Sequence, residues 1–170
     1  MNKKPSLETP VLLNSSHRVD EFDCGSDALN IYLKRFAYTN NQNGSARTYV
    51  ALRGNQVVGY YTLAAGSISK AESPERVGKG LASHPVPVIL LARLARHNEE
   101  RGTGLGPSLL KDALVRIIQA SDIIGVRAVL AHAKDEKAKE FYLLHGFEPS
   151  PIDSFHVYLL LKDIKKTLRI

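Results

Sequence analysis

The sequence of 170 residues has no tryptophan, one methionine and a single cysteine, Cys24. One cysteine cannot form an internal disulfide and offers no cysteine-based metal site. A chain of this length can bury about two-thirds of its unfolded surface, so it needs neither a disulfide nor a metal ion to fold. A reducing compartment is the expected location, and we predict a cytoplasmic protein.

Long apolar runs are also missing. No run reaches the roughly 20 residues that a transmembrane helix needs, and the basic start, MNKKPSLETP, lacks the apolar centre of a signal peptide. We therefore expect no membrane partner. The length favours one domain over residues 1–170, and no internal repeat or low-complexity tract divides it.

Acidic residues are fewer than basic ones, 17 against 23, which gives a net charge of +6. Such an excess favours a polyanionic partner such as nucleic acid, or an anionic cofactor. A cationic small-amine substrate would prefer an acidic cleft, so the charge argues mildly against one.

The most informative stretch begins with the apolar run Val86–Leu94, which is short enough for a buried strand. Three alternate glycines come after it, Gly102, Gly104 and Gly106, and then Pro107. Apolar residues next recur at helical spacing: Leu109, Leu110, Ala113, Leu114, Ile117 and Ile118. The pattern predicts a strand, a glycine-rich loop and a helix.

A glycine loop before a helix can bind phosphate, because free amides and the helix dipole meet where no Cβ obstructs a ligand. Pro107 fits the first helical turn. It also excludes the dinucleotide fingerprint, which needs glycine there, and no Gly-Lys-Ser/Thr triplet of a P-loop comes after it. A glycine-rich turn without a ligand is the alternative.

The rest of the chain alternates strands and helices. Further strands are expected at 11–13, 48–53, 57–69, 126–131 and 157–161, the second and third joined by a Gly54-Asn55 turn. Helices are expected after the N-cap Ser26, ending within 40–45, and over about 136–145. Residues 70–85 read as a polar loop, and 162–170 as a short helix or a frayed end. The pattern predicts an α/β or α+β fold with a partly antiparallel sheet.

The segment Arg101-Gly102-Thr103-Gly104-Leu105-Gly106 resembles the [QR]-x-x-G-x-[GA] motif of the GCN5-related N-acetyltransferases, the GNAT family. The resemblance implies a mixed central sheet of about six to seven strands, flanked by helices and splayed at the cofactor site near Leu94 and Arg96. It also implies that acetyl-coenzyme A (acetyl-CoA) is the co-substrate, with its pyrophosphate on the loop amides. The implied cofactor-binding residues are Leu94, Ala95, Arg96, Arg101, Gly102, Thr103, Gly104, Leu105, Gly106 and Pro107.

A second segment, AKEFYLLHGF from Ala138 to Phe147, is similar to a segment of the same family in which the tyrosine acts as general acid. The resemblance gives that role to Tyr142. A tyrosine near pKa 10 stays protonated at neutral pH and can donate to a departing thiolate. A structural aromatic is the alternative. A base is optional, because an α-amine titrates near neutrality; the candidates are His84, His97, His132 and His145, with His132 to be tested first.

Segments in one order along nearly the whole chain, from FDCGSDALNIYLKRFA to FYLLHGFEPSP, resemble the acetyltransferase toxins of type II toxin–antitoxin modules. That resemblance implies acetylation of the α-amine of aminoacyl-tRNA, which blocks translation. It also implies a ribbon-helix-helix antitoxin, operator DNA bound through the complex, and a homodimer. Phosphate contacts need basic side chains, and the candidates are Lys34, Arg35, Arg47, Arg76, Lys79 and Arg93. Arg93, if buried, would need an anionic partner.

The sequence departs from the family pattern in three places. Arg96 stands where a hydrophobic residue is usual, Pro107 where a basic one is frequent, and an expected asparagine is missing near 133–135. Two other functions stay open. One is a GNAT enzyme that acetylates a small amine or a protein N-terminus, and the other is a non-catalytic nucleotide- or nucleic-acid-binding module.

Overall fold

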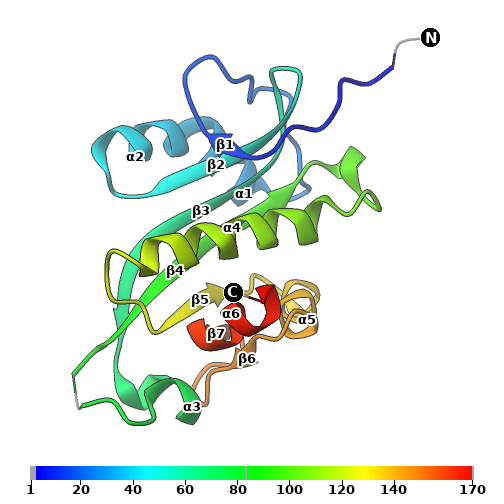
Figure 1. The fold of residues 1–170 in the computed structure, drawn as a ribbon. Helices are drawn as coiled ribbons and strands as arrows, with labels where there is room; N and C mark the ends of the chain where they lie inside the picture. The colour runs from blue at the N-terminus through cyan, green and yellow to red at the C-terminus, as the bar shows by residue number, and fades with distance from the viewer. Residues whose placement is uncertain (1–2, 83, 170) are drawn as a thin grey trace. The chain divides into compact units, whose positions relative to one another are not determined.

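The computed structural model describes residues 3–82 and 84–169. Seven strands form one mixed sheet in the order β1-β2-β3-β4-β5-β7-β6 (Figure 1). The strands are β1 Val11–Leu12, β2 Arg47–Arg53, β3 Gln56–Ile68, β4 Val86–Arg96, β5 Ala128–His132, β6 Glu148–Pro149 and β7 His156–Leu160. β4 and β5 are parallel, whereas β1–β2, β2–β3, β5–β7 and β6–β7 are antiparallel. This confirms the predicted mixed sheet.

Helices lie between the strands. They are α1 Asp27–Ile31, α2 Ala37–Asn43, α3 Glu75–Gly78, α4 Leu105–Ser121, α5 Glu136–Leu144 and α6 Leu161–Leu168. Three short elements complete the order, the π-helix η1 Tyr32–Phe36 and the 3₁₀ turns η2 Lys70–Glu72 and η3 Asn98–Glu100. The helix α6 settles the open alternative for the end of the chain.

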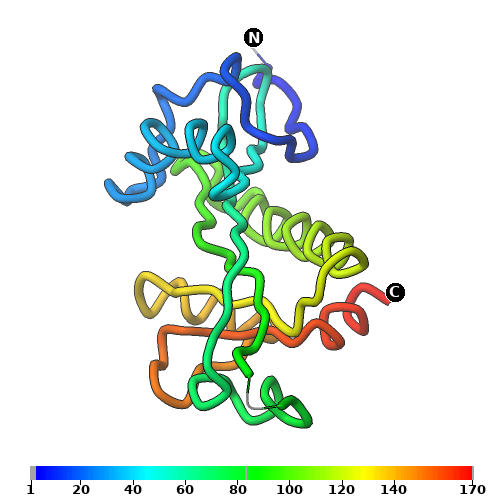
Figure 2. The backbone as a smooth tube through the Cα atoms, turned by 90° about the vertical axis from the view of Figure 1, so that its left-hand side faces the viewer, coloured from blue at the N-terminus to red at the C-terminus, as the bar shows by residue number. Residues whose placement is uncertain are grey.

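The described residues group into two compact units, one of residues 3–64 and 93–113 and the other of 65–92 and 114–169. The chain passes between the units within β3, β4 and α4, and Figure 2 traces its course. The predicted single domain over residues 1–170 stays a prediction.

The first unit starts its helical segment as predicted, because the Ser26 side chain accepts a hydrogen bond from Leu29 N. Gly44 ends the segment in the left-handed conformation, with φ 79°. Between them the turns widen into η1, which the sequence pattern did not predict. One apolar cluster forms the core of this unit: Leu13, Phe22, Tyr32, Leu33, Ala37, Val50, Leu52, Val57, Tyr60 and Ala95.

Gly59 of β3 lies at an irregular and closely packed point of the sheet. The register between β2 and β3 shifts next to its partner Ala51. A Cβ at Gly59 would lie 3.0 Å from Leu109 Cδ1 and 3.1 Å from Leu105 Cδ2. The glycine therefore lets the start of α4 pack directly against the strand.

The second unit has its own core of Ile68, Val77, Val86, Val88, Ala128, Leu130, Tyr158 and Leu160. The Asp135 side chain caps α5 by accepting from Ala138 N at 2.8 Å, and Gly146 comes just after the helix with φ 92°. The expected polar loop at 70–85 contains η2 and α3, and the Arg127 guanidinium holds it by donating to Val77 O at 2.8 Å.

Candidate active site

The glycine loop has the backbone shape that its sequence requires. Gly102 and Gly104 have φ values of 76° and 81°, and no atom lies within 4 Å of a Cβ built on either. The helix α4 begins at Leu105, and its first recorded bond runs from Ser108 N to Gly104 O at 3.2 Å. The first-turn amides therefore lack a partner four residues back. Pro107, in that turn, has no amide to satisfy, as predicted.

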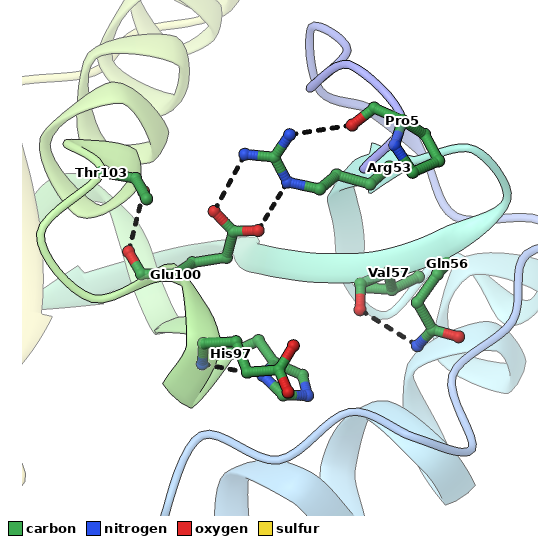
Figure 3. A network of polar contacts seen from close by, with 8 residues as sticks. Pro5, Arg53, Gln56, Val57, His97, Glu100 and Thr103 are labelled. Atoms are coloured by element: carbon green, nitrogen blue, oxygen red, sulfur yellow. Dashed lines mark hydrogen bonds and ion pairs between the residues drawn. The ribbon is translucent and has the colours of Figure 1, made fainter. Parts of the chain in front are cut away.

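An ion pair at the base of the loop was missed by the sequence reading. Glu100, 2% exposed, forms two hydrogen bonds with the Arg53 guanidinium, Nε to Oε1 at 2.6 Å and Nη2 to Oε2 at 3.2 Å (Figure 3). The Arg53 contact lowers the pKa of Glu100 below its usual value. Thr103 Oγ1 donates to Glu100 O at 2.7 Å, so the residue before the loop is tied both to β2 and to the loop.

The ladder between β4 and β5 stops before β4 ends. The recorded ladder between the two strands runs from Val88↔Ala128 to Leu91↔Ala131. The cofactor candidates Leu94, Ala95 and Arg96 lie on β4 beyond it. A strand edge can bind an extended, amide-bearing ligand through its backbone groups. This part of β4 can therefore bind the cofactor in the way that the family resemblance implies.

Arg93 differs from its expectation. Its side chain is half-buried, and its guanidinium carbon lies 3.5 Å from the centroid of the Tyr32 ring. Tyr32 in turn stacks on Tyr60, with ring centroids 6.4 Å apart. The recorded partner is an aromatic ring rather than the anion that was expected, since the negative face of a ring also attracts a cation.

The other basic candidates fall in both units. Lys34 and Arg35 on η1 and Arg47 at the start of β2 are exposed in the first unit, where Arg47 donates to Asn41 O. In the second unit, Lys79 is exposed and Arg76 pairs with two carboxylates, 2.9 Å from Asp163 and 4.0 Å from Glu148.

Tyr142 lies on α5 and is 6% exposed. Its ring packs between those of Phe141 and Phe147, at centroid distances of 5.4 and 5.1 Å. Burial raises the pKa of its hydroxyl. The side chain therefore keeps its proton at neutral pH, which a general acid requires.

The candidate histidines have different surroundings. His84 is exposed, His97 Nε2 lies 3.1 Å from Glu21 O, and His145 Nδ1 lies 2.7 Å from Phe141 O. The ring of His132 stacks on the ring of His156, with centroids 4.0 Å apart and an interplanar angle of 12°. The sequence reading did not single out His156.

A cavity of about 390 Å³ in the first unit was also unforeseen. Its lining is mostly acidic and comprises Glu21, Asp23, Gln56, Val58, His97, Glu99 and Glu100. Several of these residues appear in Figure 3. The negative lining is unsuited to a phosphate, so the cavity is separate in chemistry from the glycine loop.

Comparison with known proteins gives the family. The model of an acetyltransferase (GNAT) domain matches residues 44–149. The chain belongs to the GNAT acetyltransferases. The resemblance seen in the glycine loop is thereby confirmed, and so is the reading of this GNAT chain as an N-acetyltransferase.

Relatives of this GNAT chain match along almost its whole length. A tRNA-acetylating toxin of Mycobacterium tuberculosis is 44% identical over 156 residues, which cover 92% of this chain and 93% of that protein. The structure of AtaT complexed with acetyl-methionyl-tRNAfMet is 28% identical with a TM-score of 0.88, over 96% of this chain and 99% of that one. A tyrosine-to-phenylalanine variant of AtaT, bound to the C-terminus of the antitoxin AtaR and acetyl-CoA, is 27% identical with a TM-score of 0.83, over 97% and 99%.

No helix within the described residues is both long and apolar enough to span a membrane.

Proposed function

We propose that this GNAT enzyme transfers the acetyl group of acetyl-CoA to the α-amine of an aminoacyl-tRNA, acting as a cytoplasmic toxin that stops translation. The observation that carries the proposal is the 44% identity, over 92% of this chain, with a tRNA-acetylating toxin. The excess of basic residues supports a polyanionic substrate. The two structural relatives that hold acetyl-methionyl-tRNA and acetyl-CoA support the same pair of substrates.

The glycine loop has the chemistry to hold the diphosphate of acetyl-CoA. Its two positive-φ glycines are exposed with open space around them, and the amides of Leu105 and Gly106 come next at the start of α4. Backbone amides at a helix N-terminus bind such an anion well. Arg101 is exposed beside them and adds a positive charge. The β4 edge at Leu94–Arg96 would hydrogen-bond the pantetheine arm.

Acetyl-CoA supplies an acetyl group activated as a thioester. The amine nitrogen of the aminoacyl group bonds to the acetyl carbon while the carbon–sulfur bond breaks. Tyr142 donates its proton to the departing sulfur, and its raised pKa keeps the hydroxyl protonated at neutral pH until that step. The transfer is direct, so no enzyme nucleophile is needed. Cys24, half-buried in a turn of the first unit, has no part in it.

We propose that five basic side chains contact tRNA phosphates: Lys34, Arg35, Arg47, Lys79 and Arg93. Arg76 contributes less to this binding, because two carboxylates already pair with it. We also propose neutralisation by a ribbon-helix-helix antitoxin, operator DNA bound by the complex, and a homodimer. The AtaT variant bound to the antitoxin AtaR supports the proposal that an antitoxin neutralises this enzyme. A short ribbon-helix-helix reading frame directly upstream would agree with it.

The test uses labelled acetyl-CoA and a pool of charged tRNA, with wild type beside Tyr142→Phe. We expect label on the aminoacyl group with wild type, and a loss of about a hundredfold or more in Tyr142→Phe with acetyl-CoA binding retained. Tyr158→Phe is the control, because it removes the hydroxyl of another buried tyrosine in the same unit and should stay within about twofold.

Four outcomes separate the possible functions. Label on tRNA with wild type supports the substrate, and its loss in Tyr142→Phe alone supports the general acid. Equal activity of the two tyrosine variants would remove Tyr142 from the reaction. No label on any tRNA despite acetyl-CoA binding would redirect the enzyme to small amines or protein N-termini, and no acetyl transfer at all would leave a binding module.

A further inference from the structure

His132 occupies a special place in the second unit. It is the last residue of β5, and the ladder between β4 and β5 ends one residue earlier, at Leu91↔Ala131. It is therefore the first residue of β5 beyond the point where the two parallel strands stop pairing. Its side chain is exposed. A group placed there can be reached by a ligand and can exchange protons with water.

A second histidine holds the ring of His132. His156 of β7 is its partner in the antiparallel register, and the two imidazoles are stacked 4.0 Å apart at 12°. His156 Nε2 lies 3.4 Å from Asp153 Oδ2, an ion pair when that imidazole is protonated. The arrangement is thus a carboxylate, one imidazole beside it, and a second imidazole stacked on the first.

The charges around the pair favour a neutral His132. Partial burial of the ring, and next the charge of His156, lower the pKa of His132, while Asp153 opposes them in part. Of the other charged groups nearby, Lys134 and Asp135 pair with each other at 3.2 Å, and Lys139 of α5 lies 5.6 Å from the ring centroid of Phe155. At neutral pH an unprotonated His132 can accept a proton.

The proposed proton donor and this acceptor lie on different faces of the sheet. A Cβ on Gly146, just after α5, would lie 3.7 Å from Leu159 Cδ1, so the end of α5 that carries Tyr142 covers the Leu159 face of β7. Side chains alternate along a strand, which places His156 on the other face. The two groups can then serve opposite sides of one reacting centre.

We propose that His132 is the catalytic base that accepts the proton lost by the substrate's α-ammonium, with His156 and Asp153 as its positioning residues. This rests on the proposed function, because it needs an aminoacyl-tRNA amine as acceptor.

The nitrogen loses two protons in the reaction. His132 takes the first and releases it to water, which frees the lone pair that bonds to the acetyl carbon. The carbon–sulfur bond then breaks, and the sulfur takes the Tyr142 proton. The second proton of the nitrogen restores Tyr142, so the products are an N-acetylaminoacyl-tRNA, free coenzyme A and one proton in solution.

The pH dependence of single-turnover acetylation tests the base. An α-amine has a pKa of about 7.7–8.0, so without a base the rate falls tenfold for each pH unit below that value. With His132 as base, the proton is taken directly from the bound ammonium, so the wild-type rate should fall less steeply toward pH 6.5 than the rate of His132→Gln. The difference at pH 6.5 is at most the roughly 15- to 30-fold set by the neutral fraction lost over about 1.2–1.5 pH units. At pH 8.5, where the amine is mostly neutral, the two should agree within about twofold.

The exposed His84 provides the matched control, since His84→Gln should behave as wild type at both pH values. A uniform loss in His132→Gln at both pH values would show a structural role and overturn the proposal, and so would no loss at either. If wild type labels no tRNA at pH 8.5, the proposed function fails first, and the base assignment falls with it.

Titration of the imidazole proton resonances gives a second, activity-independent readout. His132 should titrate below the ordinary histidine pKa, and His156→Gln should move it back toward that value, because it removes the neighbouring charge. An ordinary or raised pKa of His132 in the wild-type protein would contradict the electrostatic basis of the proposal, even if the enzyme acetylates tRNA.

Discussion

The ion pair below the glycine loop makes a quantitative prediction about Glu100→Ala. The substitution removes two hydrogen bonds and leaves the Arg53 guanidinium without its carboxylate. Breaking a fully buried pair costs about 3–5 kcal/mol. The Arg53 side chain is 21% exposed and also donates to Pro5 O, so its charge remains partly solvated and paired. With that screening, we expect a loss of about 2–3 kcal/mol in the free energy of unfolding.

Urea denaturation and thermal melting would measure this loss. For a chain of this size, it corresponds to a fall in Tm of roughly 4–12 °C. Glu99→Ala is the matched control, because this neighbouring glutamate is exposed, and it should change stability by less than about 0.5 kcal/mol. A double substitution with Arg53→Ala should cost less than the sum of the two single ones.

The same pair predicts a pH dependence with a definite sign. Because Arg53 lowers the pKa of Glu100 in the folded protein, the stabilisation is present above the unfolded value of about 4.3 and is lost as pH falls through the folded value. The stability difference between wild type and Glu100→Ala should therefore be steady at neutral pH and shrink under acidic conditions. If Glu100→Ala matches Glu99→Ala in urea, or if the difference grows toward acid pH, the pair does not stabilise the fold.

Two glycine substitutions test the loop and the helix start. Gly104→Ala places a Cβ on a residue with φ 81°, which costs about 1–2 kcal/mol. Calorimetry should therefore show acetyl-CoA binding weakened by about tenfold. Unchanged affinity would mean that binding does not need this backbone conformation. Gly59→Ala would press on Leu105 and Leu109 at 3.0–3.1 Å, so urea denaturation should show a loss of about 1–3 kcal/mol, whereas a neutral result would mean that these leucines yield freely.

Local signals predicted much of the fold and the loop. The hairpin at Gly54-Asn55, the cap at Ser26, and the change of apolar period after the glycines each depend on residues close together in the sequence. Capping, turn and periodicity rules act at that range, so they located these elements to within a few residues. The start of α4 lies two residues before Pro107, because Leu105 and Gly106 already belong to its first turn.

Contacts between distant segments could not be predicted in the same way. Glu100 pairs with Arg53, which lies 47 positions earlier in the sequence, and His132 stacks on His156, which lies 24 positions later. The register between β5 and β7 brings the two histidines together. No local sequence pattern marks either pair. A glutamate or histidine that forms such a contact is the same residue type as one that is exposed to solvent. The two-residue strand β6 and the π-helical turn η1 were also missed, because each is set by the neighbouring packing rather than by a period of its own.

Arg93 is a cation held by an aromatic ring instead of an anion. Desolvation alone predicted an anionic partner, but the Tyr32 face at 3.5 Å stabilises the guanidinium without neutralising it. Arg76 is the opposite case, because Asp163 and Glu148 offset its charge. A phosphate that approaches Arg93 therefore meets a full positive charge on a side chain already fixed in place, and little ordering entropy remains to be lost. For Arg76, the same phosphate must compete with two carboxylates, which is why Arg93 is the stronger candidate for the substrate's polyanion.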